Sequence, residues 1–173
     1  MASWPLAGLR LGHSLIPLAD PVEVAESPLI ALAETCERHV RYSRDDIAAF
    51  ARMTGDSNPV HHDAQAAQRA RHGEIIASGQ QTTALMIGLA ASYFSRADDG
   101  QSRELLCLNF NFAFKAPVFA EQDLQLRWRV ANVEWNAKLG GWLAHVDGTA
   151  GVAHASPPVV GRGTLLVKAA SGG

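Results

Sequence analysis

The sequence predicts an α+β fold of one domain, in which an antiparallel sheet curls around one long buried central helix. Residues 75–95 carry no charged side chain. A helix that is apolar on nearly every side is typical of a protein interior. Four predicted strands follow, two of them with clear alternation of apolar and polar residues, and turns join them, which favours antiparallel pairing. A sheet with one apolar face buries such a helix most economically by curling round it.

The helices are predicted from start and stop signals. Ser43 caps the first helix, with Asp46 three residues on in a capping-box arrangement, and the helix ends near Met53. Asp63 caps a short helix over residues 64–71. Ser78-Gly79 starts the long helix, of roughly 15 residues, which runs to about Phe94.

The strands are predicted from period-two alternation. The segment that follows the long helix, at 106–114, is the clearest, and five large apolar residues are expected on its one apolar face: Leu106, Leu108, Phe110, Phe112 and Phe114. The other expected strands are 35–42, 124–130, 142–152 and 160–168, with a hairpin turn at 138–141.

The domain is expected to span residues 35–168. Residues 1–34 hold four prolines that prevent a long helix. They are interpreted as an N-terminal arm over the core or against a partner chain, with partial disorder as the alternative. Residues 169–173 are expected to fray.

Composition excludes several classes of protein. The formal charge is -2 and no basic cluster occurs, so we expect no nucleic-acid partner. The longest clean apolar run, Ala84–Ala91, has eight residues, too few for a membrane span. Two cysteines give no disulfide framework, and the N-terminus does not resemble a signal peptide. We therefore expect a cytoplasmic protein that has no membrane association.

The stretch Thr54–His61 is the candidate for chemistry. Asp56 and His61 face one small volume if the chain between them turns, and Asn58-Pro59 supplies a turn. Gly55 permits a tight exit from the preceding helix. The stretch alone is also compatible with a simple turn followed by a half-buried histidine.

This loop, followed by the buried helix, resembles the MaoC-like dehydratases of the hotdog fold, and most closely their (R)-specific enoyl-CoA hydratases. The element Gly-Asp-x-Asn-Pro-x-His carries the resemblance, together with Ile75–Gly79 and Phe112–Val118 further along. It covers roughly residues 35–168. It implies a single hotdog domain that hydrates or dehydrates acyl-CoA thioesters.

The resemblance implies roles for particular residues. Asp56 and His61 match the catalytic pair, and Asn58 matches the residue that supports it. Gly79 matches the glycine whose backbone N–H receives the thioester carbonyl. Ser78 stands where many members have histidine.

Substrate contacts are expected from Asn58, Ser78 and Gln80. Gln80 begins a polar run, with Gln81 and Thr82, where many hydratases are more apolar. This departure bears on acyl-chain preference more than on the reaction. No cofactor or metal is expected, since coenzyme A belongs to the substrate.

The chemistry requires a base and a stabilised enolate. Asp56 is expected to take a proton from water while His61 holds that water, which then adds to C3 of a trans-2-enoyl thioester. The Gly79 N–H, at a helix start, stabilises the enolate oxygen. The product is an (R)-3-hydroxyacyl thioester, and the reverse reaction is a dehydration.

Two other functions remain open. A hotdog thioesterase usually carries its acid on the central helix, and Gln81–Phe94 holds none. A non-catalytic thioester-binding subunit is disfavoured by the intact Asp56–His61 pair. Arg127 or Arg129 is a possible contact for the coenzyme A phosphates, although a solvated strand face is the simpler interpretation.

One sheet covers only part of a helix that is apolar all round. We therefore expect a homodimer or a dimer of dimers.

Overall fold

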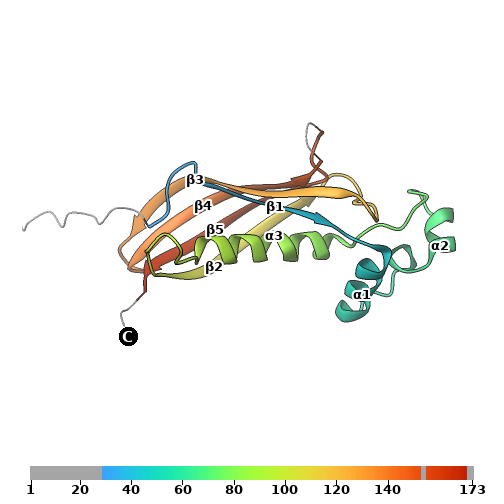
Figure 1. Ribbon diagram of the computed structural model, residues 1–173, viewed down its shortest axis with the longest axis horizontal. Helices are drawn as coiled ribbons and strands as arrows, with labels where there is room; N and C mark the ends of the chain where they lie inside the picture. Colours follow the sequence, from blue (N-terminus) through green and yellow to red (C-terminus); the bar gives the residue numbers. More distant parts are fainter. Residues whose placement is uncertain (1–28, 153–154, 171–173) are drawn as a thin grey trace, which may run out of the picture.

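The computed structural model of the chain describes residues 29–152 and 155–170 (Figure 1). The predictions for residues 1–28 and 171–173 lie outside the described residues. In the described part, no helix is long and apolar enough to cross a membrane.

Five antiparallel strands form one sheet in the order β1-β3-β4-β5-β2. The sheet curls over α3, and α1 and α2 stand at one end of the molecule (Figure 1). The predicted α+β arrangement is therefore confirmed. The elements are β1 (Thr35–Arg41), α1 (Arg44–Thr54), the 3-10 turn η1 (Pro59–His61), α2 (Ala64–Arg69), α3 (Gly79–Phe94), β2 (Arg103–Phe114), β3 (Asp123–Asn136), β4 (Gly141–Gly151) and β5 (Val159–Ala169).

Trp128 is the centre of the core. Its indole is fully buried and its Nε1–H donates to the Met86 carbonyl of α3 at 2.7 Å, which fixes the helix against the sheet. Gly148 on β4 makes room for the ring, because a Cβ there would lie 2.4 Å from it, and Gly161 on β5 makes room mainly for the neighbouring ring of Phe112. One large aromatic side chain therefore sets the spacing between sheet and helix.

Only one side of α3 is buried in the single chain. Met86, Ala90 and Phe94 pack on the sheet. On the opposite side of the helix, Ala84 and Gly88 are exposed. The expectation that this helix is buried on nearly every side is therefore wrong for one chain alone.

The expectation that β2 has five large apolar residues on one face is also wrong. The register with β5 shifts between Cys107 and Asn109, as at a β-bulge. Leu106 pairs with Leu166, and Phe110 pairs with Gly163. Residues 163 and 166 of β5 point to opposite faces of the sheet, so Leu106 and Phe110 do so as well. Leu106 is 58% exposed as a result.

The last residues of the predicted N-terminal arm are docked on the sheet. The Ala33 N–H donates to the Val130 carbonyl at 3.0 Å, and the Val130 N–H donates to the Glu34 carbonyl at 2.8 Å. Glu34 also pairs with Arg96, which follows α3, at 2.8 Å. Residues 29–34 are thus held against β3 and the end of α3.

Candidate active site

The Thr54–His61 loop is built as its sequence indicates. Gly55 ends α1 with φ +73°, and the Asp56 N–H donates to the Ala51 carbonyl at 2.8 Å. Asn58 caps η1: its Oδ1 accepts from the Val60 N–H at 3.4 Å, and Pro59 is the first residue of the turn. The loop is therefore short and held at both ends.

The loop brings Asp56 and His61 together. Asp56 Oδ2 lies 3.4 Å from His61 Nε2, and the other carboxylate oxygen accepts the Asn58 N–H at 3.1 Å. His61 is 6% exposed, whereas the Asp56 side chain is 26% exposed. Asn58 therefore orients the pair through its backbone and caps the turn with its side chain.

A backbone oxygen selects the tautomer of His61. Its Nδ1 lies 2.7 Å from the Ile76 carbonyl oxygen. A carbonyl only accepts, so Nδ1 carries the hydrogen and the neutral ring presents a lone pair at Nε2. Nε2 and Asp56 Oδ2 are then two acceptors side by side, and a water molecule donating both hydrogens satisfies them together.

The Ile76 carbonyl is itself held firmly. Ile76 N–H donates to the Val60 carbonyl at 3.3 Å, and Ala77 N–H donates to the Val118 carbonyl at 2.8 Å. These bonds tie the Thr54–His61 loop, the start of α3 and the segment after β2 into one unit. The sequence gives no sign of this, because the contact is made by a backbone atom.

A pocket of about 620 Å³ opens beside the pair. His61 lines it, with Ser78, Gly79 and Gln80 from the start of α3; Asp56 and Asn58 do not. Ser78 is buried and caps α3, its Oγ accepting from the Gln81 N–H at 3.4 Å. The remaining lining residues are Arg71, His72, Ile76, Ala77, Thr82, Phe114, Lys115, Ala116, Pro117, Val118 and Val159.

Gly79 is a glycine because of Phe114. A Cβ at residue 79 would lie 2.5 Å from the nearest Phe114 ring carbon. The first N–H groups of a helix have no partner inside it, so this end of α3 presents donors and a positive dipole end. The space that a Cβ at residue 79 would take is therefore occupied by an aromatic ring.

A second groove, of about 500 Å³, lies on the other side of the α3 start. Phe50 and Met53 of α1 line it, with Tyr42, Gln81 and Leu85. Gln81 is 6% exposed and its Oε1 is buried without a hydrogen-bond partner among the described residues. Arg41 and Asp46 also line this groove, so its wall is partly charged.

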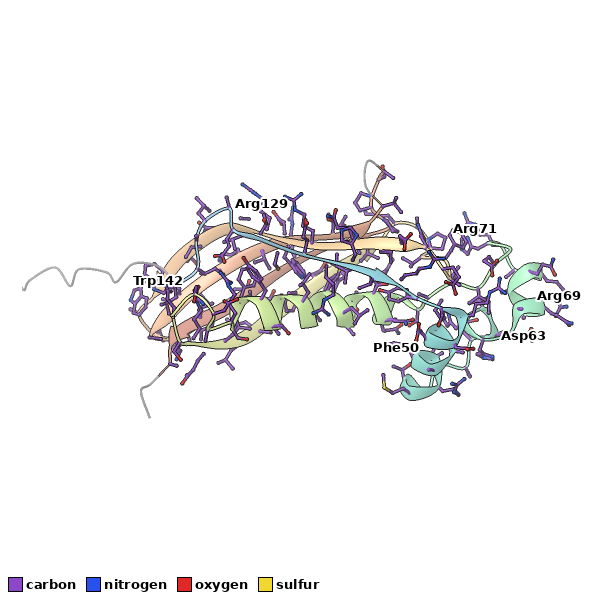
Figure 2. The ribbon with its side chains drawn as sticks, in the orientation of Figure 1. Phe50, Asp63, Arg69, Arg71, Arg129 and Trp142 are labelled. Carbon is purple, nitrogen blue, oxygen red and sulfur yellow. The ribbon has the colours of Figure 1, made fainter. Side chains whose placement is uncertain are left out.

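Two other residues discussed from sequence lie away from the pocket. Arg129 is on the outer face of the sheet, remote from Arg71 at the α1–α2 end (Figure 2). Arg127 is on the same face, and neither arginine lines the pocket. The single chain thus gives no support for phosphate contacts from Arg127 or Arg129.

The profile of the MaoC-like domain family matches residues 29–141. A solved (R)-hydratase from A. caviae involved in PHA biosynthesis superposes with a TM-score of 0.68 at 19% identity, covering 79% of this chain and 96% of that one. The ChsH1-ChsH2 complex from Mycobacterium tuberculosis gives 0.65 at 17% identity, covering 80% and 98%.

A curated relative is the 3-hydroxyacyl-[acyl-carrier-protein] dehydratase FERN, mitochondrial, of Solanum lycopersicum. It is 23% identical over 100 residues, which are 58% of this chain and 56% of that protein. The chain therefore spans about half the length of this relative. The names of these relatives agree with the predicted enzyme class, a hydro-lyase.

The family profile covers most of the chain, and the likeness to the solved structures shows the fold. The chain belongs to the MaoC-like domain family and has the hotdog fold, as its sequence predicts.

Proposed function

We propose that this protein adds water to a trans-2-enoyl thioester, or removes water from an (R)-3-hydroxyacyl thioester. The observation that carries the proposal is the pair of adjacent acceptors, His61 Nε2 and Asp56 Oδ2, 3.4 Å apart beside a pocket. The Ile76 carbonyl keeps Nε2 unprotonated in the neutral ring. Two acceptors and an open pocket suit a bound water as the nucleophile.

In hydration, the water donates one hydrogen to Nε2 and the other to the Asp56 carboxylate. As its oxygen bonds to C3, the O–H bond towards Asp56 breaks and the carboxylate takes the proton. The C2–C3 double-bond electrons move towards the thioester carbonyl and form an enolate. The pair, acting as one unit, then returns the proton to C2, so atoms and charge balance.

The start of α3 meets the charge that develops on the thioester oxygen. Gly79 lines the pocket at the first helical position. A preorganised N–H donor at such an oxygen is worth roughly 3–4 kcal/mol of transition-state stabilisation. Ser78 and Gln80 flank it and are the proposed substrate contacts. Asn58 supports Asp56 and does not line the pocket.

The reaction needs no cofactor beyond the thioester handle, because water, the acid–base pair and the helix end account for every step. Coenzyme A and acyl carrier protein both supply such a handle; the A. caviae relative is named as an (R)-hydratase and the tomato relative as an acyl-carrier-protein dehydratase. We propose a cytoplasmic location. The tomato relative is named as a mitochondrial protein.

We also propose a homodimer. β2 pairs with β5 on one side only and is an edge of the sheet, and the exposed stripe of α3 carries small side chains that another helix can approach closely. Antiparallel self-pairing of an edge strand gives a closed two-fold dimer. One of the similar structures is a complex of two named chains.

One assay with purified protein and crotonyl-CoA separates the candidate functions. We expect the enoyl absorbance to fall with no release of free thiol. Thiol release would instead make the protein a thioesterase, which the absence of an acid from α3 disfavours. If neither signal changes while binding persists, the protein is a non-catalytic thioester binder and the proposal is wrong.

A further inference from the structure

Besides His61, three side chains that can carry positive charge line the pocket. They are Arg71, His72 and Lys115, and no Asp or Glu is among the described residues that line this pocket. The chain as a whole carries a formal charge of -2. The pocket is therefore locally cationic on a slightly acidic protein, which favours an anionic ligand.

The three side chains come from two segments held by backbone hydrogen bonds. Arg71 and His72 follow α2 in a turn closed by the Gly73 N–H, which donates to the Ala70 carbonyl at 3.1 Å, with Gly73 at φ +71°. Lys115 follows β2, and its N–H donates to the Pro158 carbonyl at 2.7 Å. The backbone that carries them is thus held in place before any ligand binds, and the exposed side chains extend from it.

The three side chains are also free to bind an anion. Among the described residues, none of them forms an ion pair with a carboxylate. Glu74, the acid closest to them in sequence, is engaged by Arg44 at 3.0 Å. The carboxylate that would compete for Arg71 is therefore already neutralised.

All three are exposed, whereas His61 is buried. The cations thus lie at the outer rim of the pocket and the acid–base pair lies within it. A coenzyme A thioester is arranged in the same way. Its reacting carbons are at one end, and its phosphates lie at the other end of the pantetheine arm. Arginine and lysine are the side chains that bind phosphate best.

We propose that Arg71, His72 and Lys115 form a phosphate-binding rim that holds the handle of the thioester. This inference rests on the proposed function, since it assumes a pantetheine thioester. The shared chemistry is the phosphate of the phosphopantetheine arm, which coenzyme A and acyl carrier protein both carry. Arg127 and Arg129, on the outer face of the sheet, take no part.

The test measures binding, so it does not depend on turnover. Butyryl thioesters cannot be hydrated, because they have no double bond. Dissociation constants are measured by calorimetry for butyryl-CoA, butyryl-phosphopantetheine and butyryl-pantetheine, which share the acyl end and carry decreasing numbers of phosphates. The proteins are the wild type, the variant Arg71→Ala/Lys115→Ala, and Arg127→Ala/Arg129→Ala as the matched control.

For the wild type we expect affinity to fall roughly tenfold or more on removal of the last phosphate, the usual scale for a charge-assisted contact. Arg71→Ala/Lys115→Ala is expected to bind butyryl-pantetheine as the wild type does and to lose the preference for phosphate. The control variant is expected to keep that preference. If butyryl-CoA alone shows the gain, the cations bind the nucleotide part, and the assignment to the shared phosphate is overturned.

Two results overturn the rim. One is a wild type that binds the three thioesters equally; the other is a rim variant that weakens all three by the same factor. Neither result depends on hydration of crotonyl-CoA. If the wild type shows the phosphate preference but does not hydrate crotonyl-CoA, the proposed function is wrong and the phosphate-binding rim is still supported.

Discussion

Gln81 and Thr82, adjacent on α3, are both buried and yet differ in how their polar atoms are satisfied. The Gln81 Oε1 has no partner among the described residues, whereas the Thr82 Oγ1 accepts from the Tyr42 hydroxyl at 3.4 Å. An unpaired buried polar group costs roughly 1–3 kcal/mol. The two positions therefore respond in opposite directions to an apolar replacement.

Gln81→Met keeps the side-chain length and removes the unpaired oxygen. We expect the free energy of unfolding to stay equal or to rise, by up to about 2 kcal/mol, in urea titrations. Thr82→Val, the matched control, leaves the Tyr42 hydroxyl unpaired and is expected to lower the free energy of unfolding by about 1 kcal/mol. A marked loss of stability in Gln81→Met would show that its amide is paired in solution.

The site residues divide by how much of their geometry is encoded locally. The bend that joins Asp56 to His61 was predictable, because Gly55 and Asn58-Pro59 each dictate a backbone conformation. The Ile76 carbonyl that fixes the imidazole and the Phe114 ring against Gly79 were not. Both contacts join segments far apart in the chain, and no residue type signals them.

At the scale of the elements, caps were predictable and strand faces were not. The Ser43–Asp46 capping box and the Ser78 cap are present as their sequences indicate. The face that Leu106 occupies depends on a register shift against β5. A bulge is decided by the partner strand, so alternation within β2 alone gives the wrong face.

The connection between α3 and β2 is predicted to be sensitive to acid. Arg103, which hydrogen-bonds Asp99, lowers the pKa of that carboxyl from 3.8 to about 2. Arg103 also donates to the Leu29 carbonyl at 2.8 Å and to the Arg96 carbonyl at 2.7 Å, so this connection joins the N-terminal segment to the sheet.

Because the folded pKa of Asp99 is the lower one, the stabilisation is complete above about pH 4 and is lost as pH falls towards 2. Asp99→Asn should therefore be less stable than the wild type at pH 6, with a difference that shrinks between pH 4 and pH 2. Asp98→Asn, at an exposed neighbour, should follow the wild type throughout. Chemical unfolding at several pH values measures this, and a pH-independent difference would contradict it.

At the scale of the whole molecule, two exposed features predict that two copies of the chain associate. One is the unpaired edge of β2, and the other is the exposed side of α3 at Ala84 and Gly88. Multi-angle light scattering at micromolar concentration should give twice the 18.5 kDa mass of one chain. Gly88→Arg, on the exposed side of α3, should shift the protein towards single chains by placing a charge in the contact. Thr149→Arg, on the outer face of the sheet, should not.

A wild type with the mass of one chain would contradict the dimer. It would also leave the exposed side of α3, at Ala84 and Gly88, without a second helix packed on it. The sequence predicted this feature in part, since a helix apolar on all sides needs more cover than one sheet provides. It did not show which side of α3 stays bare, because that depends on where Trp128 fixes the helix.

The most direct test of the account is the turnover number for crotonyl-CoA hydration in a double-mutant cycle of Asp56→Asn and His61→Gln. If the two side chains hold one water, each single variant loses at least roughly 100-fold, and the double variant loses little more than either. Circular dichroism should show an unchanged fold in all three. Near wild-type turnover in Asp56→Asn, or losses that multiply in the double variant, would contradict a shared water.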